Sequence, residues 1–469
     1  MTDLPLLSAD GVLTRVALRE APGFVRPEAP LRTRIAYAAA HVVPKAHADN
    51  TPGRPADIDW DATLAFRRHV YGWGLGVADA MDTAQRNMGL DAAATRELIA
   101  RSAEVAREAG GSVVVGVNTD HVDEEHIALD RVIDAYRAQL EFTEEQGAGP
   151  VLMASRHLAR AAQSAADYRR VYREVLRAAT APVVLHWLGT AFDPALEGYF
   201  GSADWRVAAD VLLEIIAENP GAVAGVKMSL LDAESEVSVR ARLPEGVRMF
   251  TGDDFNYVGL IGGDEGAGVS SRSARSTTGE VPDLDEGAGV SSRSARSTTG
   301  AVPDLDEVAG VSSRSARSTT GGAPDLDEVA GVSSRSARST TGEVPAPVEG
   351  HSDALLGAFA AITPVASAAI QALDAGDPAG YLRILGPTEA LSRQVFAAPT
   401  FYYKTGVAFL SWLNGHQAAF QMVGGLHSAR SLPHLSRIVE LANASQALER
   451  PDLAASRWSD LLRLNGVAP

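Results

Sequence analysis

The 469-residue sequence contains no cysteine. It can therefore form no disulfide bond, supply no thiol nucleophile and bind no metal through a thiolate. It also lacks an apolar run of the roughly 18 residues that a membrane crossing needs, and its first residues lack the basic-then-apolar order of a signal peptide. We therefore expect a soluble, cytoplasmic protein.

Basic residues are scarce relative to acidic ones. The chain has 42 Lys and Arg against 59 Asp and Glu, which gives a formal net charge of −17. Nucleic acids and anionic membranes attract clustered positive charge, so the composition argues against both as partners. Gly74 and Gly76 lack the third glycine and the preceding strand of a dinucleotide-binding motif, so no cofactor is predicted.

One long segment has too few apolar residues to belong to a packed core. Four near-identical copies of a 21-residue unit, first GAGVSSRSARSTTGEVPDLDE, fill residues 266–349. The unit is rich in Ser, Thr, Gly, Arg and Asp and contains no aromatic residue. Such a unit cannot bury enough apolar area to offset its ordering entropy, so we expect disorder there. We also expect that removing it leaves the fold and the activity intact.

In the rest of the chain, short apolar runs alternate with longer helical patterns. The expected strands cover residues 34–43, 74–81, 112–119, 149–155, 181–189, 222–229, 247–254 and 354–359. Eight such units predict a (β/α)8 TIM barrel. We expect an N-terminal extension over 1–33, the barrel over 34–363 with the repeats inserted, and a C-terminal helical region over 364–469.

A lysine lies inside one of these apolar runs, GAVAGVKMSL, at position 227. Burying an ammonium costs several kcal/mol unless it is paired or neutralised. If Val226 and Met228 pack against the helices, the alternation along a strand points Lys227 into the barrel. Desolvation there lowers a lysine pKa and frees the amine to attack a carbonyl carbon. The sequence therefore predicts imine chemistry at Lys227.

Polar side chains also follow the ends of the other expected strands, where a barrel carries its active site. We predict that His186 shuttles a proton, because the pKa of imidazole lies near neutrality, and that Thr83 assists it. The residues assigned to substrate binding are Asp82, His41, His157, Arg156 and Asp253. Asp253 and Asp254 also suit the cap of the following helix.

Several of these segments resemble the corresponding segments of one enzyme superfamily. VAGVKMS followed by VRMFTGDD resembles the strand-six lysine and the strand-seven Gly-Asp-Asp of the dihydrodipicolinate synthase and N-acetylneuraminate lyase superfamily. APVVLHWLG resembles its fifth strand, MDTAQ stands at the turn after its second strand, and FYYKTGVAFLSWLNG resembles the helix with its C-terminal lysine. The resemblance implies a TIM barrel, an imine-forming lysine at position 227 and a homo-oligomer.

The sequence departs from that family at two positions. His186 stands where the family has its catalytic tyrosine, and Ala191 stands where the family has the arginine that binds the substrate carboxylate. The resemblance therefore implies imine chemistry more strongly than a particular substrate. Its nearest match is a branch described only as dihydrodipicolinate synthase-like.

Three interpretations remain open. The first is a Schiff-base-forming lyase or aldolase that acts on a 2-oxo acid or a sugar-derived keto compound. The second is a metal-dependent barrel aldolase or hydrolase in which His41, His157 and His186 bind zinc. The third is a barrel that has lost catalysis and binds a small molecule.

Overall fold

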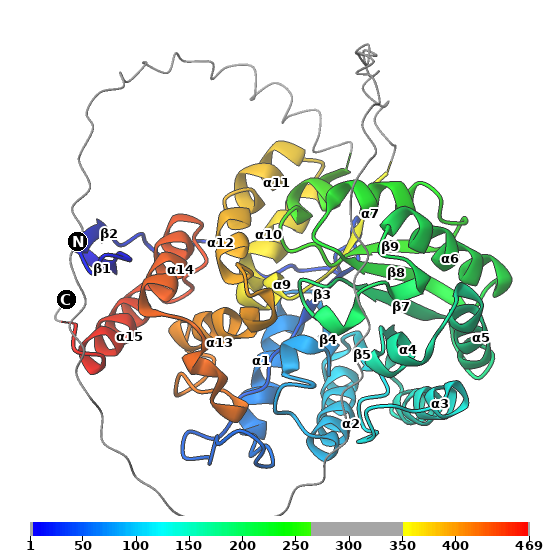
Figure 1. Ribbon diagram of the computed structural model, residues 1–469. Helices are drawn as coiled ribbons and strands as arrows, with labels where there is room; N and C mark the ends of the chain where they lie inside the picture. The colour runs from blue at the N-terminus through cyan, green and yellow to red at the C-terminus, as the bar shows by residue number, and fades with distance from the viewer. Residues whose placement is uncertain (1–2, 264–349, 468–469) are drawn as a thin grey trace, which may run out of the picture. The chain divides into compact units, whose positions relative to one another are not determined.

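The computed structural model describes residues 3–263 and 350–467, all of which belong to one compact unit. Eight parallel strands close into a barrel in chain order, and the last strand pairs with the first (Figure 1). Their bounds are β3 Ala36–Ala39, β4 Gly76–Asp79, β5 Val113–Val117, β6 Gly149–Met153, β7 Val183–Leu188, β8 Val223–Ser229, β9 Arg248–Thr251 and β10 Asp353–Leu356. The predicted (β/α)8 TIM barrel is confirmed.

The alternation of side chains along the strands separates two apolar cores. The side chains that point into the barrel form a small core, which includes Met153, Val184, Phe250 and Leu355. The larger core lies between the strands and the surrounding helices, and it contains Val226 and Met228. Because Lys227 lies between these two residues on β8, its side chain points into the barrel, as the pattern predicted.

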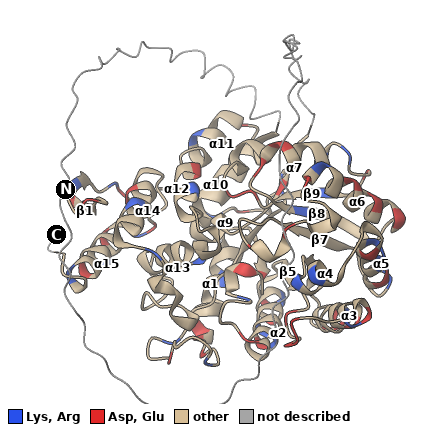
Figure 2. Cartoon of the chain, in the orientation of Figure 1, with Lys and Arg blue, Asp and Glu red and all other residues tan. Residues whose placement is uncertain are grey.

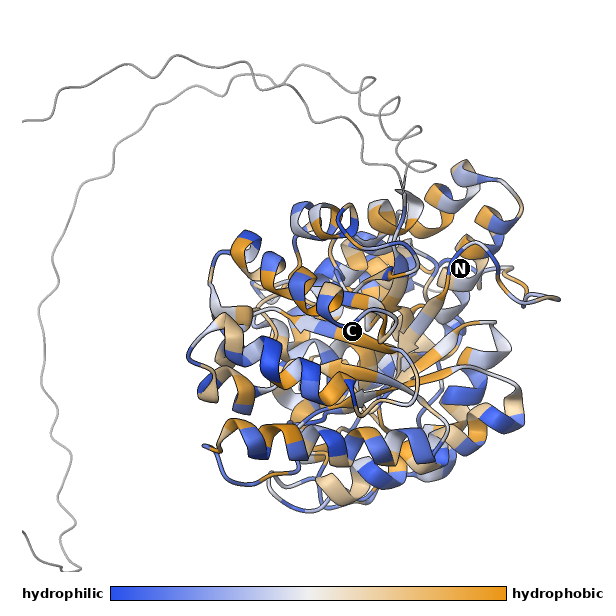
Figure 3. Ribbon diagram, turned by 90° about the vertical axis from the view of Figure 1, so that its right-hand side faces the viewer, coloured by the Kyte–Doolittle hydropathy of each residue, from blue (hydrophilic) through white to orange (hydrophobic). Residues whose placement is uncertain are grey.

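Helices on the outside of the barrel connect its strands. They are α1 Trp60–Gly72, α2 Ala92–Ala109, α3 Leu129–Glu145, α4 Arg156–Ala161, α5 Ala165–Leu176, α6 Trp205–Glu218 and α7 Ala233–Arg240, and residues 257–263 are also helical. Asp59, Asp91, Asp204 and Asp232 begin four of them, because each side chain accepts a hydrogen bond from a backbone N–H of the first turn. Figure 3 shows hydrophilic residues on the outer faces of the helices and hydrophobic residues on the strands.

The C-terminal region is helical, as expected. Its helices are α9 Ala358–Ala361, α10 Thr363–Asp374, α11 Pro378–Leu385, α12 Thr388–Val395, α13 Tyr403–Leu413, α14 Leu432–Ala444 and α15 Pro451–Leu464. An N-terminal hairpin of β1 Asp3–Leu7 and β2 Leu13–Ala17 lies beside α14 and α15 (Figure 1). The Leu7 N–H donates to Oγ of Ser436 at 2.7 Å, and Nε1 of Trp458 donates to the Pro5 carbonyl at 2.7 Å.

The four repeats predicted to be disordered lie outside the described residues. The two ends of the described chain on either side of them are in contact. A Cβ placed on Gly263 would meet the carbonyl oxygen of Gly350 at 2.5 Å. The chain therefore leaves the described fold and returns to it at one point, just before the N-terminal end of β10. Lys227, in contrast, is near the C-terminal end of its strand.

Charged residues are interspersed on the outer helices, as Figure 2 shows. Arg169 on α5 pairs with Glu214 on α6 at 2.7 Å, and Arg170 on α5 pairs with Asp130 on α3 at 2.5 Å. Within residues 3–263 and 350–467, no helix has the length and the apolar character that a membrane crossing requires.

Candidate active site

Lys227 lies near the C-terminal end of β8, with its side chain inside the barrel. Its register partners are His186 on β7 and Phe250 on β9. The residue is 7% exposed. Burial lowers the pKa of the Lys227 amine to about 8, although the nearby carboxyl groups of Asp82 and Asp254 oppose this change. The amine therefore loses its proton at a much lower pH than the amine of a solvent-exposed lysine.

Gly252, directly after β9, makes room for the lysine side chain. A Cβ at this position would lie 2.9 Å from Cε of Lys227 and 2.2 Å from Oγ of Ser229. It would also lie 2.8 Å from the carbonyl oxygen of Met228, which is backbone and cannot rotate away. The glycine of the Gly-Asp-Asp sequence is therefore required by the close approach of β8.

Asp253 is engaged in local hydrogen bonds. Its Oδ1 accepts hydrogen bonds from the N–H groups of Phe255 and Asn256 at 2.9 and 3.1 Å, and its Oδ2 accepts one from Nδ2 of Asn256 at 2.7 Å. This arrangement begins the helix over 257–263, which is the capping role that the sequence also suggested. Both carboxyl oxygens of Asp253 are thus bound within its own turn, and its predicted contact with substrate remains untested.

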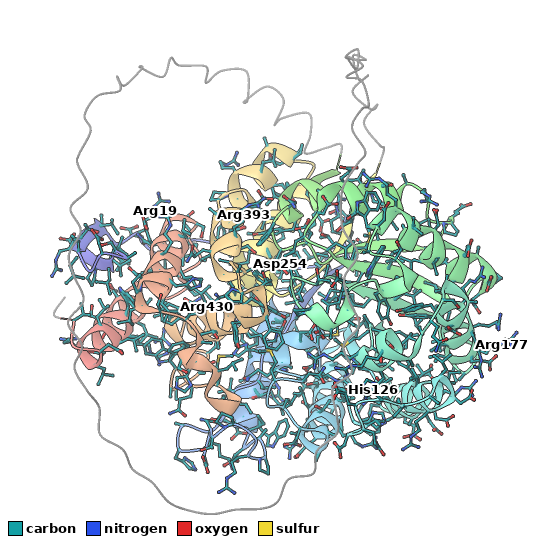
Figure 4. All side chains as sticks on the ribbon, in the orientation of Figure 1. Arg19, His126, Arg177, Asp254, Arg393 and Arg430 are labelled. Atoms are coloured by element: carbon teal, nitrogen blue, oxygen red, sulfur yellow. The ribbon has the colours of Figure 1, made fainter. Side chains whose placement is uncertain are left out.

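Asp254 is the member of the pair that interacts electrostatically with Lys227. It lies in the interior beside α9, as Figure 4 shows, and its Oδ1 accepts a hydrogen bond from the N–H of Ala358 at 2.9 Å. Burial raises the pKa of Asp254 to about 8, and the charge of Lys227 opposes that rise. A carboxyl group that can hold a proton near neutral pH therefore belongs to the surroundings of the amine.

His186 points to the same side of the sheet as Lys227, since the two residues are register partners. Its Nε2 lies 3.2 Å from Oγ of Ser229, and its buried Nδ1 has no hydrogen-bond partner in the described part of the chain. Burial, assisted by the charge of Lys227, holds the pKa of His186 well below its usual value. The ring is therefore neutral at neutral pH and has a lone pair available to accept a proton.

Asp82 and Thr83 belong to a strained turn after β4. Within this turn Ala80, Gln85 and Asn87 have φ angles of 48°, 62° and 62°. A non-glycine residue in this left-handed region costs about 1–3 kcal/mol, and such strain persists only where surrounding contacts fix the backbone. The shape of the turn must therefore be stabilised from outside.

Two side chains of the turn supply that stabilisation. Nε and Nη2 of Arg86 donate to the two carboxylate oxygens of Asp120 at 2.6 Å each, and its Nη1 donates to the Ala80 carbonyl at 3.1 Å. Nε2 of Gln85 donates to the carbonyl of Val423 at 2.7 Å, and its Oε1 accepts from the N–H of Val423 at 3.2 Å. The barrel and the C-terminal region thus fix the turn together.

Tyr403, at the start of α13, reaches Thr83 and was missed by sequence reasoning. The two hydroxyl oxygens are 2.8 Å apart, and the tyrosine ring stacks on Phe396 with ring centroids 4.3 Å apart. Gly357 leaves space for the ring, because a Cβ there would approach Tyr403 to 3.0 Å. Burial raises the pKa of Tyr403 well above its usual value, so the hydroxyl keeps its proton and can donate it to a hydrogen bond.

Lys404, the next residue, is a second buried amine. It is 2% exposed, its Nζ donates to the Phe401 carbonyl at 3.1 Å, and it lies 4.4 Å from the centroid of the Tyr403 ring. Burial lowers the pKa of Lys404 to about 8, and Asp82 opposes this change. Asp82 therefore interacts electrostatically with both buried lysines.

Lysine is rare in this chain, and most of its lysines are buried. The whole sequence has three lysines, Lys45, Lys227 and Lys404, and uses arginine at all other basic positions. The two that are buried belong to this site. An arginine can carry the charge of a lysine, but it cannot replace a neutral amine as a nucleophile. The resemblance of FYYKTGVAFLSWLNG to a lysine-bearing helix points to Lys404, and this count is a second sequence signal for it.

A cavity of about 210 Å³ opens at the C-terminal ends of the strands. Its walls include Asp82, Asn118, Met153, Arg156, His157 and Asp193. Met153 on β6 is the register partner of His186 on β7, so the cavity reaches the level of His186 and Lys227, although neither of these two residues lines it. Three of the residues assigned to substrate binding, Asp82, Arg156 and His157, are therefore brought together at one cavity.

Two of the basic side chains that line this cavity, Arg156 and His157, already have partners. Nε of Arg156 donates to Oδ2 of Asp193 at 2.6 Å. Nδ1 of His157 lies 2.8 Å from Oγ1 of Thr119, and its Nε2 lies 2.9 Å from the carbonyl oxygen of Glu124. His157 is thus fixed at both ring nitrogens, whereas Arg156 retains N–H groups beyond the one that binds Asp193.

His41 does not line the cavity. It is 2% exposed, its Nε2 lies 3.1 Å from Oε1 of Gln417, and its ring packs on Phe66 with centroids 4.8 Å apart. Burial lowers the pKa of His41 to about 3. The structure places this residue between the barrel and the C-terminal region, away from the position expected for a substrate contact.

The histidines of the metal interpretation are not brought together either. Among the described residues, the one group whose three ligand atoms lie within 4.8 Å of one another is His69, His416 and Glu449. It includes none of His41, His157 and His186, so the zinc-binding set expected at the barrel mouth does not form there.

Comparison with known proteins supports the same fold. The structure is similar to dihydrodipicolinate synthase from Aquifex aeolicus, with a TM-score of 0.54, 10% identity, and coverage of 89% of this chain and 99% of that one. It is also similar to dihydrodipicolinate synthase from Bacteroides thetaiotaomicron, with a TM-score of 0.54, 11% identity, and coverage of 89% and 100%. The enzyme from Oceanobacillus iheyensis gives a TM-score of 0.50, 12% identity, and coverage of 88% and 96%.

At this identity the likeness concerns the fold. A search of curated proteins finds no match. A family model described as "Protein of unknown function (DUF993)" matches residues 4–273 and 343–467, which leaves out most of the repeats and covers nearly all of the barrel and the C-terminal helices. The chain therefore belongs to the DUF993 family, with the fold of the dihydrodipicolinate synthases.

Proposed function

We propose that the protein is an imine-forming lyase or aldolase that acts on a 2-oxo acid or a sugar-derived keto compound. The observation that carries this proposal is the environment of Lys227. Its amine lies inside the barrel, burial lowers its pKa to about 8, and the carboxyl groups of Asp82 and Asp254 are its electrostatic neighbours. An amine of this kind is a nucleophile toward carbonyl carbon near neutral pH.

The proposed reaction begins with attack of Nζ of Lys227 on the carbonyl carbon of the substrate. Loss of the carbonyl oxygen as water gives a protonated imine. The bond that then breaks joins the carbon beside the imine carbon to the carbon that bears a hydroxyl. Its electron pair moves toward the imine nitrogen, and the hydroxyl on the departing fragment loses its proton to a base. Cleavage leaves an enamine, which takes up a proton at carbon and becomes an imine again. Water then hydrolyses this imine, releases the second product and restores the amine.

The surrounding groups would move the protons in these steps. Asp254, with its raised pKa, can supply the proton that the departing water requires. His186 is the register partner of Lys227, so we assign it the proton of the substrate hydroxyl, although its lowered pKa makes it a weaker base than an exposed histidine. The hydrogen-bonded pair of Thr83 and Tyr403 is proposed as a second route for a proton. Tyr403 thus supplies a phenol to a barrel in which His186, on β7, stands where the dihydrodipicolinate synthase superfamily has its tyrosine.

Substrate binding would rely on the cavity walls. Ala191, which replaces the carboxylate-binding arginine of the resemblance, is exposed. Arg156 lines the cavity and has free N–H groups, so we propose that it contacts the anionic or hydroxylated end of the substrate. Association of several copies and a cytoplasmic location remain predictions, and sedimentation of the full chain would determine the first.

Borohydride trapping tests the proposal directly. The full chain is incubated with a panel of 2-oxo acids, keto sugars and simple aldehydes, reduced, digested and examined by mass spectrometry. We expect one adduct on Lys227, which is absent in Lys227→Ala and unchanged in Lys45→Ala. Because the chain has only three lysines, assignment of the adduct is unambiguous. No adduct on Lys227 from the whole panel, in a protein shown to be folded, would contradict an imine mechanism.

A further inference from the structure

A second cluster of metal-ligating side chains joins the barrel to the C-terminal region. His69 lies on α1, His416 follows α13, and Glu449 lies just before α15. One ligand atom from each of these residues lies within 4.8 Å of the other two. Three residues that are far apart in the sequence thus present two imidazoles and one carboxylate to a single point.

The contacts within this cluster leave one nitrogen without a partner. Nε2 of His416 lies 2.8 Å from Oε1 of Glu449. Nε2 of His69 lies 3.6 Å from the same oxygen, is buried, and has no hydrogen-bond partner among the described residues. A buried polar atom without a partner is uncommon in folded proteins and calls for an explanation.

Neighbouring contacts hold the three ligands in place. Oδ1 of Asn414 accepts from the N–H of Glu449 at 2.9 Å, and its Nδ2 donates to the Ala447 carbonyl at 3.0 Å, which ties together the two loops that carry His416 and Glu449. The Phe66 ring stacks on His69 at 5.9 Å between centroids and meets His416 edge-on at 5.4 Å. The site is thus built on fixed segments with an apolar wall.

We propose that His69, His416 and Glu449 form a binding site for a divalent transition-metal ion of the zinc type. Two imidazole nitrogens and one carboxylate oxygen are a ligand set that suits zinc, with water as the fourth ligand. The side chains of His69, His416 and Glu449 are 14%, 18% and 22% exposed, which leaves access for that water. The metal would bind the orphaned Nε2 of His69.

Such an ion would couple the C-terminal region to the barrel. Gln417, next to His416, lies 3.1 Å from Nε2 of His41, just after β3. The same segment leads to Val423, whose backbone holds Gln85 and thereby the turn with Asp82 and Thr83. The ion would therefore hold the segment over 416–423 to the barrel, and none of its three ligands lines the cavity that contains Arg156 and His157.

Metal binding is measured on the full chain, purified without a polyhistidine tag and stripped with a chelator. We expect one Zn²⁺ per chain with micromolar or tighter affinity, a rise of several degrees in Tm on adding Zn²⁺, and the visible absorption of tetrahedral Co²⁺ when cobalt replaces zinc. His416→Gln and Glu449→Gln should each weaken binding at least tenfold and remove the rise in Tm.

The matched control is His126→Gln, because His126 is exposed on the far side of the molecule from the C-terminal helices (Figure 4). It should bind Zn²⁺ as the wild type does. His69→Gln offers a third variant if one of the others fails to fold, and the cobalt spectrum of the wild type needs no variant. Substoichiometric zinc after dialysis against micromolar Zn²⁺, or equal zinc affinity in the wild type and a folded Glu449→Gln, would overturn the proposal.

Discussion

The amine of Lys227 and the carboxyl group of Asp254 are buried together inside the barrel, and the charge of each opposes the effect of burial on the other. One proton added to this pair neutralises the carboxylate or charges the amine. The pair therefore places a proton donor and a nucleophile in the same buried environment.

The reactivity of Lys227 should depend on pH with a midpoint near 8. Below its pKa of about 8 the amine is protonated and unreactive, and above it the amine is free. Because the Asp82 carboxylate raises that pKa, Asp82→Asn should move the midpoint down by about one pH unit. Mass spectrometry after brief acylation over a pH series measures this, with Lys45, whose side chain is 45% exposed, as the internal reference. A midpoint near that of an ordinary lysine would contradict the prediction.

Gly252→Ala should abolish imine trapping. The added Cβ would overlap Ser229 Oγ at 2.2 Å and Cε of Lys227 at 2.9 Å, so the lysine must leave its position. We expect more than a tenfold loss of trapped adduct and a destabilisation of about 1–3 kcal/mol in chemical denaturation. The control is Gly259→Ala, since a Cβ at Gly259 meets no atom within 4 Å. Full trapping in folded Gly252→Ala would disprove the role given to this glycine.

The hydroxyl pair of Thr83 and Tyr403 should affect proton transfer and not imine formation. Thr83→Val and Tyr403→Phe each remove the 2.8 Å hydrogen bond, which contributes about 1 kcal/mol to stability. With a 2-oxo acid that forms an adduct, both variants should keep that adduct. They should slow deuterium exchange at the carbon beside the carbonyl, followed by NMR, by about ten- to a hundredfold.

Combining the two substitutions shows whether the hydroxyls of Thr83 and Tyr403 act together or independently. If the hydroxyls act as one unit, Thr83→Val combined with Tyr403→Phe should be no slower than either single variant. Multiplied effects, or exchange at the wild-type rate in both single variants, would exclude the relay.

Glu236 on α7 should make stability fall as the pH rises. It is 1% exposed, its Oε1 accepts from Oγ of Ser352 at 2.7 Å, and burial raises its pKa to about 8 from the usual 4.5. Between pH 4.5 and about 8 the folded chain keeps the proton of Glu236 and the unfolded chain has lost it. The contribution of this proton to the free energy of unfolding is therefore complete below pH 4.5 and is lost as the pH rises to about 8.

Thermal or chemical unfolding of Glu236→Gln measures this effect. Between about pH 5 and about pH 9 the variant should gain on the order of 1–3 kcal/mol relative to the wild type. Glu234→Gln, with a side chain that is 72% exposed on the same helix, should show no such trend. Parallel pH profiles for the wild type and Glu236→Gln would show that the carboxyl group ionises normally in the folded chain.

Deletion of residues 266–349 should leave cooperative melting and trapping at Lys227 unchanged. Gly263 and Gly350 are already in contact, so joining the chain there requires no movement of β10. Shortening the connection also lowers its closure entropy cost, so we expect a shift in Tm of no more than a few degrees. Loss of a cooperative transition in the deleted chain would mean that the repeats contribute to the fold.

The barrel and the position of its lysine could be predicted from the sequence because both depend on local patterns. Eight apolar runs and the strand period of two were sufficient to place Lys227 inside and Val226 and Met228 outside. Asp254 and Asp253 could not be distinguished in the same way. One carboxylate caps the following helix and the other lies near Lys227. Because the two residues are adjacent and identical, the sequence does not indicate which of them has which role.

The contributions of the C-terminal region required the structure. Tyr403 meets Thr83 across 320 positions of sequence, and no periodicity relates the two. His41 was misplaced for a related reason. A histidine at a strand end suggests a cavity, but Gln417 and Phe66 occupy its surroundings. Contacts of this kind are decided by tertiary packing, which propensity and spacing do not encode.

The seating of the β1–β2 hairpin against α14 and α15 has a consequence for the order of synthesis. The hairpin emerges from the ribosome long before α14 and α15. It contacts these helices through the N–H of Leu7 and through the indole of Trp458. α13 is translated after all eight strands, so a chain that ends before it lacks the phenol of Tyr403 and the amine of Lys404. The earliest and the latest segments of the chain can therefore meet only after every residue of the site has been made.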